Sequence, residues 1–148
     1  MYYFEDLQVG ETVDLGTVTP TQEEIIAFAR QFDPQYFHTD VERASDSPFG
    51  GLIASGWHTI SLFMRLFVDE LLSQTVSLGS PGIDEIRWFK PVYPGDTLTA
   101  RFTLTAATPS KSRPTMGIWH SLCEMYNQRD ELVMSFKGIH MIGRRPEI

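Results

Sequence analysis

The chain has 148 residues, of which 42% are hydrophobic and 21% are charged, and its formal net charge is −7. These proportions are ordinary for one globular domain and argue against a disordered chain. Nucleic acid and anionic membranes both require a basic surface, and the basic residues here form no run. The composition therefore argues against both as general partners and leaves an anionic small molecule open as a ligand.

The N-terminal stretch MYYFEDLQVGE has neither the basic region nor the apolar region of a secretory signal, and no apolar run reaches transmembrane length. We therefore expect a cytoplasmic protein. The single Cys123 cannot form a disulfide within the chain, and its strand-like surroundings favour a buried small hydrophobe. The four histidines form no HxH, HExxH or Cys/His cluster, so we expect no metal site.

The first predicted elements are a strand and an amphipathic helix. Residues 12–18 favour a short strand, and the helix begins either at Thr19-Pro20 or at a capping box that opens at Thr21. Pro34 forces this helix to stop just before it. Asp33 then lies at the C-terminal end of the helix, where we expect the helix dipole to raise its affinity for protons.

A long helix follows a turn-prone segment. One or two helical turns at residues 39–44 and a glycine-rich loop at 45–51 lead into an apolar pattern that begins at Ile53 and ends near Ser73. The apolar positions are Ile53, Trp57, Ile60, Met64, Phe67, Val68 and Leu71. Steps of three and four residues predict a long, mostly buried helix. Its start near Gly56 offers unpaired N–H groups and the positive end of the dipole to a carbonyl oxygen or an anion.

Beyond residue 80 the pattern becomes typical of strands. The predicted strands cover residues 82–90, 97–105, 116–126 and 132–142. The segment 97–105 alternates cleanly between apolar and polar residues, which predicts one buried face. A long helix followed by antiparallel strands indicates an α+β fold in which one curved antiparallel sheet wraps around the helix.

Asp33 and His38 are the main candidates for chemistry. They are five residues apart, and the bulky or rigid residues 34–37 between them predict a packed segment whose polar side chains need partners. The plainer alternative is an Asp that ends a helix and a His exposed on a loop. An acid/base pair beside the donor groups of a helix start is the equipment needed for chemistry next to a carbonyl.

The other candidates leave more alternatives open. Gly56 is either part of this site or a packing glycine where the helix crosses the sheet. His58 lies at the same helix start and either lines the same pocket or has a role in the core. His120 and His140 fall in strand-like segments and are expected to be ordinary sheet residues.

The segments DPQYFH (33–38), FGGLIASG (49–56) and DEIRWFKPVYPGDTL (84–98) together resemble the MaoC-like dehydratases, R-specific enoyl-CoA hydratases of hot-dog fold. The resemblance covers nearly the whole chain and implies one hot-dog domain over residues 1–148. It implies that Asp33 and His38 hold the catalytic water and that the Gly56 amide binds the thioester oxygen. The substrate would be an acyl-CoA, with no cofactor, and the assembly a homodimer or a dimer of dimers.

The chain departs from the family pattern D-x-N-P-[IL]-H, because Pro34 follows the Asp directly, and Ser55 replaces the usual His before Gly56. These changes leave the catalytic pair intact and alter the acyl pocket. The residues expected to contact substrate are Tyr36, Phe37, Ser55, Trp57, His58 and Arg87. Bulky side chains among them suggest a short or branched acyl group. Basic residues expected near the phosphates of coenzyme A are Arg87, Lys90, Lys111 and Arg113.

Two other functions compete with the hydratase. Hot-dog thioesterases commonly carry a carboxylate on the central helix, but here Asp69 and Glu70 lie only near its far end. A non-catalytic acyl-CoA-binding protein would have no reason to keep Asp33, His38 and Gly56 together.

Overall fold

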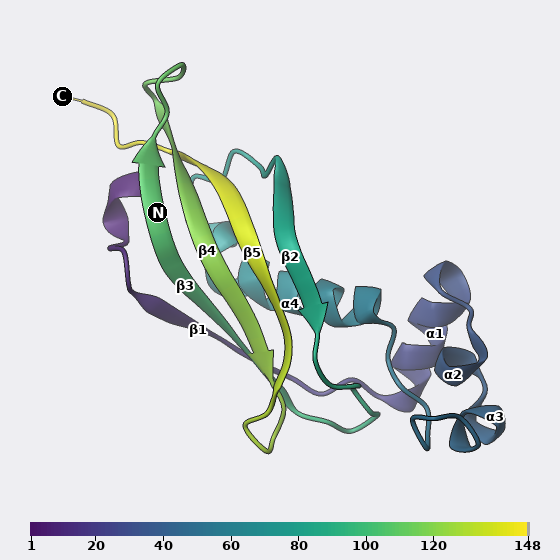
Figure 1. Ribbon diagram of the computed structural model, residues 1–148. Coiled ribbons are helices and arrows are strands. Elements are labelled where there is room, and N and C mark those ends of the chain that lie inside the picture. Colours follow the sequence, from purple (N-terminus) through teal and green to yellow (C-terminus); the bar gives the residue numbers. More distant parts are fainter. Residues whose placement is uncertain (148) are drawn as a thin grey trace.

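The computed structural model describes residues 1–147, which form a five-stranded antiparallel sheet curved around one long helix (Figure 1). The strands are β1 (Thr12–Val18), β2 (Gly82–Trp88), β3 (Leu98–Pro109), β4 (Met116–Tyr126) and β5 (Leu132–Gly143). The helices are α1 (Gln22–Phe32), α2 (Tyr36–Thr39), α3 (Val41–Ser45) and α4 (Gly56–Glu70), with short 3₁₀ turns η1 (Phe4–Asp6) and η2 (Leu72–Gln74). The predicted α+β architecture is confirmed.

The strand order in the sheet is β1-β3-β4-β5-β2. Only β3, β4 and β5 are therefore neighbours both in the chain and in the sheet. β1 pairs with β3 on one edge, and β2 pairs with β5 on the other. Short turns join β3, β4 and β5 as direct neighbours, whereas β2 follows α4 in the chain and reaches the far edge of the sheet.

The core lies between the sheet and α4. The alternation predicted for residues 97–105 is confirmed, because Leu98, Ala100, Phe102 and Leu104 are fully buried. From the helix, Phe67 stacks on Phe102 with 5.3 Å between ring centroids. These contacts fix one side of α4 against the middle of the sheet.

Helix α4 begins at Gly56, three residues later than the apolar pattern suggested. Ile53 and Ala54 instead lie before the helix and bind neighbouring segments. The Ile53 N–H donates to the Phe37 carbonyl (3.0 Å), and the Ala54 N–H donates to the Val92 carbonyl (2.8 Å). The chain before α4 therefore joins the α2 segment to the loop that follows β2.

The expectation of a mostly buried helix was wrong for one side of α4. The sheet covers the side that carries Phe63 and Phe67, whereas Trp57, Met64 and Val68 are 56%, 46% and 37% exposed. The apolar pattern spans two sides of the helix, and the sheet can cover only one of them. No helix within residues 1–147 combines the length and the apolar character needed to cross a membrane.

Cys123 and His140 are both buried on the inner face of the sheet, but only the burial of Cys123 was predicted. Cys123 is buried as expected, and burial raises its pKa to about 12. His140 is no ordinary sheet residue, because it is buried against Phe67 with its Nε2 2.8 Å from the Ser121 hydroxyl. Burial, with a smaller effect of His120, lowers the pKa of His140 to about 4.

We expect the free energy of unfolding to fall as the pH drops from about 6.5 to about 4. The unfolded chain protonates His140 near its ordinary pKa, whereas the folded chain keeps it neutral down to a pKa of about 4. The unfolded state therefore takes up the proton first, and stability rises with pH by up to about 1.4 kcal/mol per unit, or about 3 kcal/mol in all. Urea denaturation across this range would measure the slope.

The variant His140→Gln, which keeps a hydrogen-bonding group near Ser121, should flatten this slope. The variant His120→Gln, on the opposite face of the sheet, is the matched control and should keep most of the dependence of stability on pH. A slope as steep in His140→Gln as in the wild type would contradict the assignment.

Candidate active site

Helix α1 delivers Asp33 to the site. Its capping box is the predicted one at Thr21, whose hydroxyl accepts from the Glu24 N–H while the Thr21 N–H donates to the Glu24 carboxylate, both at 3.1 Å. The alternative start at Thr19 is therefore wrong. The helix ends at Phe32, and Asp33 caps it through an N–H bond of 2.8 Å to the Ala29 carbonyl.

His38 lies on α2, a single helical turn within the segment that was predicted to be turn-prone and packed. The side chain is only 5% exposed, so it is no solvent-exposed loop histidine. Its Nδ1 is 2.6 Å from the Ile53 carbonyl oxygen. A carbonyl can only accept, so Nδ1 carries the proton and donates. In the neutral imidazole, Nε2 is then left as an acceptor.

Asp33 and His38 meet side by side. Nε2 of His38 is 3.3 Å from Oδ2 of Asp33, and the Ser55 hydroxyl donates to the same Oδ2 at 2.7 Å. The other oxygen, Oδ1, accepts from the Gln35 side-chain amide at 2.8 Å. The carboxylate is thus held in one orientation by two neutral donors.

The surroundings of Asp33 lower its pKa. Burial alone raises the pKa, but the hydrogen bonds from Ser55 and Gln35, with the nearby His38, favour the charged form more strongly. The expectation that the dipole of α1 would raise the proton affinity of Asp33 was therefore wrong. Direct donors to the carboxylate outweigh the effect of the helix end, so Asp33 is ionised at neutral pH.

Gly56 is the first residue of α4, after Ser55 as the N-cap. Its N–H, like the others in the first turn, has no carbonyl four residues earlier within the helix. A Cβ at this position would come within 2.5 Å of the Trp88 indole, so the close approach of Trp88 requires glycine. Gly56 is therefore both the exposed start of the helix and a packing glycine.

A cavity of about 470 Å³ brings Asp33, His38 and Gly56 together. Its other walls come from α2, from the start of α4 and from residues 88–92. Among the residues expected to contact substrate, Phe37 and Trp57 line this cavity. Ser55 is fully buried and acts behind the lining, through its bond to Asp33.

Three other residues expected to contact substrate do not line the cavity. Tyr36 carries the Arg43 guanidinium over its ring at 4.5 Å, and His58 stacks on Phe28 at 4.6 Å. Arg87 pairs with β5 in the sheet and is exposed. The crowding that suggested a short or branched acyl group therefore has support from Phe37 and Trp57 only.

The basic residues expected near the coenzyme A phosphates are dispersed. Lys90 lines the cavity, whereas Lys111 and Arg113 lie in the β3–β4 turn (Figure 1). This turn is at the end of the sheet opposite to the one where β2 ends at Trp88. Of these four basic residues, Lys90 is thus the one that lines the candidate site.

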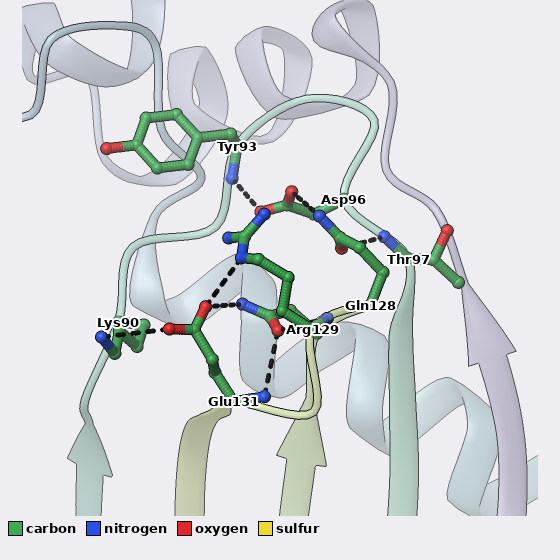
Figure 2. A network of polar contacts seen from close by, with 8 residues as sticks. Lys90, Tyr93, Asp96, Thr97, Gln128, Arg129 and Glu131 are labelled. Atoms are coloured by element: carbon green, nitrogen blue, oxygen red, sulfur yellow. Dashed lines mark hydrogen bonds and ion pairs between the residues drawn. The ribbon is translucent and has the colours of Figure 1, made fainter.

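The loop between β4 and β5 holds the wall that carries Lys90 (Figure 2). Glu131 accepts from Asn127 and Arg129, each at 2.9 Å, and pairs with Lys90 at 3.3 Å. These partners lower the pKa of Glu131 to about 2. Glu131 therefore connects Lys90 to the β4–β5 loop and shares its one negative charge between Lys90 and Arg129.

A second set of bonds fixes the turn that continues from this wall (Figure 2). The Gln128 side chain donates to Asp96 and accepts from the Thr97 N–H, both at 3.0 Å, and Asp96 accepts from the Tyr93 N–H at 2.9 Å. Tyr93 in turn donates from its hydroxyl to the Phe49 carbonyl at 2.6 Å. These bonds thus connect the β4–β5 loop, the turn at residues 93–97 and the loop before α4, which lie around the cavity.

The amino-acid sequence matches known proteins over most of its length. Residues 6–118 match the MaoC like domain. The chain belongs to the MaoC-like family. The resemblance inferred from residues 33–38, 49–56 and 84–98 is therefore confirmed, and the helix wrapped by a curved sheet is the hot-dog fold.

Three proteins illustrate the relationship. A MaoC-like dehydratase from Rhodospirillum rubrum has a crystal structure that superposes on this MaoC-like chain with a TM-score of 0.88, at 41% identity over 99% of this chain and 100% of that one. The uncharacterized protein YdeM of Bacillus subtilis is 31% identical over 134 residues, 90% of this chain and 92% of YdeM. The 3-hydroxyacyl-thioester dehydratase Z of Mycobacterium tuberculosis is 38% identical over 89 residues, 59% of each chain.

Among the contacts of this MaoC-like site that were not predicted, two differ in the signal that the sequence offers. The hydrogen bond from the Gln35 side chain to the Asp33 carboxylate joins residues two apart. Side chains at this spacing can reach each other, so the sequence carried a signal for this contact. The contact of Trp88 with Gly56 joins residues 32 apart and has no local signal. Within residues 1–147, no cluster of three or more His, Cys, Asp or Glu side chains is arranged to hold a metal ion.

Proposed function

We propose that this protein is a hydro-lyase that adds water to a trans-2-enoyl-CoA or removes water from the corresponding (R)-3-hydroxyacyl thioester. The observation that carries the proposal is the meeting of Asp33 Oδ2 and His38 Nε2 at 3.3 Å, in one cavity with the start of α4. The relatives named as dehydratases support the reaction class.

The geometry of the pair suits the activation of one water molecule. The ionised Asp33 and the unprotonated Nε2 of His38 are both acceptors and lie 3.3 Å apart, so one water that contacts both atoms would donate one hydrogen to each. A water bound in this way has both hydrogens engaged and presents an oxygen lone pair to C3 of the enoyl group. Asp33 would take one proton of the water as the C–O bond forms, and His38 would help return this same proton to C2.

The Gly56 amide would stabilise the charge that develops on the thioester. Attack at C3 moves electrons onto the carbonyl oxygen and forms an enolate, which needs a donor already in place. The N–H of Gly56 lacks a helical partner and lies at the positive end of α4. The reaction forms no covalent link to the enzyme and, as proposed, needs no cofactor.

The acyl chain would extend along α4. A second cavity of about 280 Å³, lined by apolar residues such as Ile60, Met64 and Phe136, lies further along the same helix. Met64 is about 12 Å from Gly56 by the rise of the helix. This space provides room for more than a short chain, so turnover of enoyl-CoA substrates of increasing length is the measurement that decides between short or branched and longer acyl groups.

We also propose a homodimer formed through β2. This strand is at the edge of the sheet, is mostly exposed, and lies beside the uncovered apolar side of α4 that carries Trp57, Met64 and Val68. A long exposed edge next to an apolar surface is normally covered in a soluble protein. Assembly into a dimer of dimers would use a further surface.

A hot-dog thioesterase is the second candidate, and the described residues favour it less. The carboxylates of α4 are Asp69 and Glu70, at the far end of the helix from Gly56. Asp69 is exposed and paired with Arg65 at 2.8 Å. Neither carboxylate lines the cavity that holds Asp33 and His38.

An absorbance assay with crotonyl-CoA tests the proposed function. Loss of the enoyl-thioester band that requires both Asp33 and His38 and releases no free thiol would establish the hydratase. Loss of the band together with an equal release of free thiol would favour the thioesterase, because hydrolysis also destroys the enoyl thioester. Neither signal with a panel of enoyl-CoA substrates would favour a non-catalytic acyl-CoA-binding protein.

Replacing Ser55 by Ala should shift the pH dependence of activity. The Ser55 hydroxyl is the strongest of the donors that lower the pKa of Asp33, so its removal should raise that pKa. Asp33 must be ionised to take a proton, and the acid limb of the kcat/KM profile should therefore move to higher pH. Thr21→Ala, which removes an equivalent N-cap from α1, is the matched control and should leave the limb in place.

A further inference from the structure

Trp88, at the end of β2, covers the first residue of α4. Its indole N–H donates to the Gly56 carbonyl at 3.0 Å, and its ring atoms would lie 2.5 to 2.9 Å from a Cβ at position 56. The indole therefore contacts the backbone of Gly56 on the side where other residues carry a side chain. It also lines the cavity that holds Asp33 and His38.

A bulge in β2 turns Trp88 toward α4. The pairing with β5 shifts register between Asp84 and Arg87, and Glu85 has a φ of 52°, an unusual value for a residue other than glycine. Before the bulge, Ile83 lines the cavity beside α4. If side chains alternated strictly along β2, the odd-numbered residues would face the inner side of the sheet, as Ile83 does. Trp88 would then face outward.

The bulge reverses this alternation. After it, Ile86 packs against the core and Trp88 reaches Gly56 on the inner side. One extra residue in a strand is a recognised way to redirect a side chain next to a functional site. The unusual backbone at Glu85 thus has a specific structural result, the placement of the indole over the start of α4.

From these contacts we propose that Trp88 is a positioning residue for the Gly56 amide. Glycine has the widest choice of backbone angles, and the first turn of a helix is its least constrained part. The indole packs against one side of Gly56 and donates to the Gly56 carbonyl. We infer that these two contacts together restrict the φ and ψ angles of Gly56. The proposal rests on the proposed function, because the group that is positioned is the donor to the thioester oxygen.

The variant Trp88→Phe keeps an aromatic ring and removes the N–H donor. We expect kcat with crotonyl-CoA to fall about tenfold and KM to change by less than about twofold, because the donor matters most when charge develops on the oxygen. Trp119→Phe is the matched control, since it removes another indole bond, 3.0 Å from the Phe4 carbonyl, away from the site. Its kcat should stay near that of the wild type.

A second experiment separates positioning from general stability. Gly56→Ala should be nearly inactive, because its methyl group meets the indole, and Trp88→Leu should restore part of kcat when added to Gly56→Ala. An unchanged kcat in Trp88→Phe, a change confined to KM, an equal loss of kcat in Trp119→Phe, or no rescue in the double variant would each overturn the proposal.

The same double-variant cycle distinguishes this inference from the proposed function. If the wild type has no hydratase activity, the proposed function fails. The coupling between Gly56 and Trp88 in the free energy of unfolding would then still show whether the indole holds the start of α4, while the catalytic role would be lost with the function.

Discussion

Asp33→Asn should lower kcat/KM for crotonyl-CoA by about 10³-fold to 10⁴-fold, the largest effect that we expect from any single substitution. The amide cannot take a proton from water. An Asn at this position could also donate directly to His38 Nε2, which is 3.3 Å from Asp33 Oδ2, and so compete with the water for this acceptor. Stopped-flow or steady-state absorbance at the enoyl-thioester band would measure the loss.

The fold and ligand binding should survive this change. Asn can still accept from the Ser55 hydroxyl, so the free energy of unfolding at neutral pH should change by about 1 kcal/mol or less. Asp46→Asn, an exposed carboxylate at the end of α3, is the matched control and should retain full activity. An unfolded Asp33→Asn variant would instead indicate that Asp33 has a structural role.

His38→Asn should lower kcat/KM by about 10²-fold to 10³-fold while the fold is retained. The side-chain amide of Asn can occupy the place of Nδ1 and keep the donor to the Ile53 carbonyl, which lies 2.6 Å away in the wild type. It has no atom at the place of Nε2, so the water beside Asp33 loses one of its two acceptors. The comparison isolates Nε2 from the structural bond at Nδ1.

The effects of the two substitutions should not add. Both residues would hold the same water, so the double variant Asp33→Asn with His38→Asn should be little worse than Asp33→Asn alone. His120→Asn, on the outer face of the sheet, is the control for loss of a histidine. Losses that multiply in the double variant would argue against one shared water.

Local sequence signals predicted most of the elements correctly. The capping box at Thr21, the stop before Pro34 and the alternation from Leu98 to Leu104 act between residues close in the chain. The motif segments that resemble the MaoC-like family then placed Asp33, His38 and Gly56 in one site, and the structure brings these three residues to one cavity. Such signals are readable because backbone geometry and hydrophobic periodicity depend on near neighbours.

The tertiary structure decided what depends on contacts between distant segments. The pKa of Asp33 is lowered by Ser55, 22 residues away, and the helix end that predicted the opposite direction has less effect. Gly56 is required because Trp88, 32 residues away, approaches its backbone after a bulge in β2. The sequence by itself determined the family, the fold and the candidate pair Asp33 and His38. The lowered pKa of Asp33, the sides of α4 that are covered and the packing at Gly56 follow from long-range contacts, which no local pattern encodes.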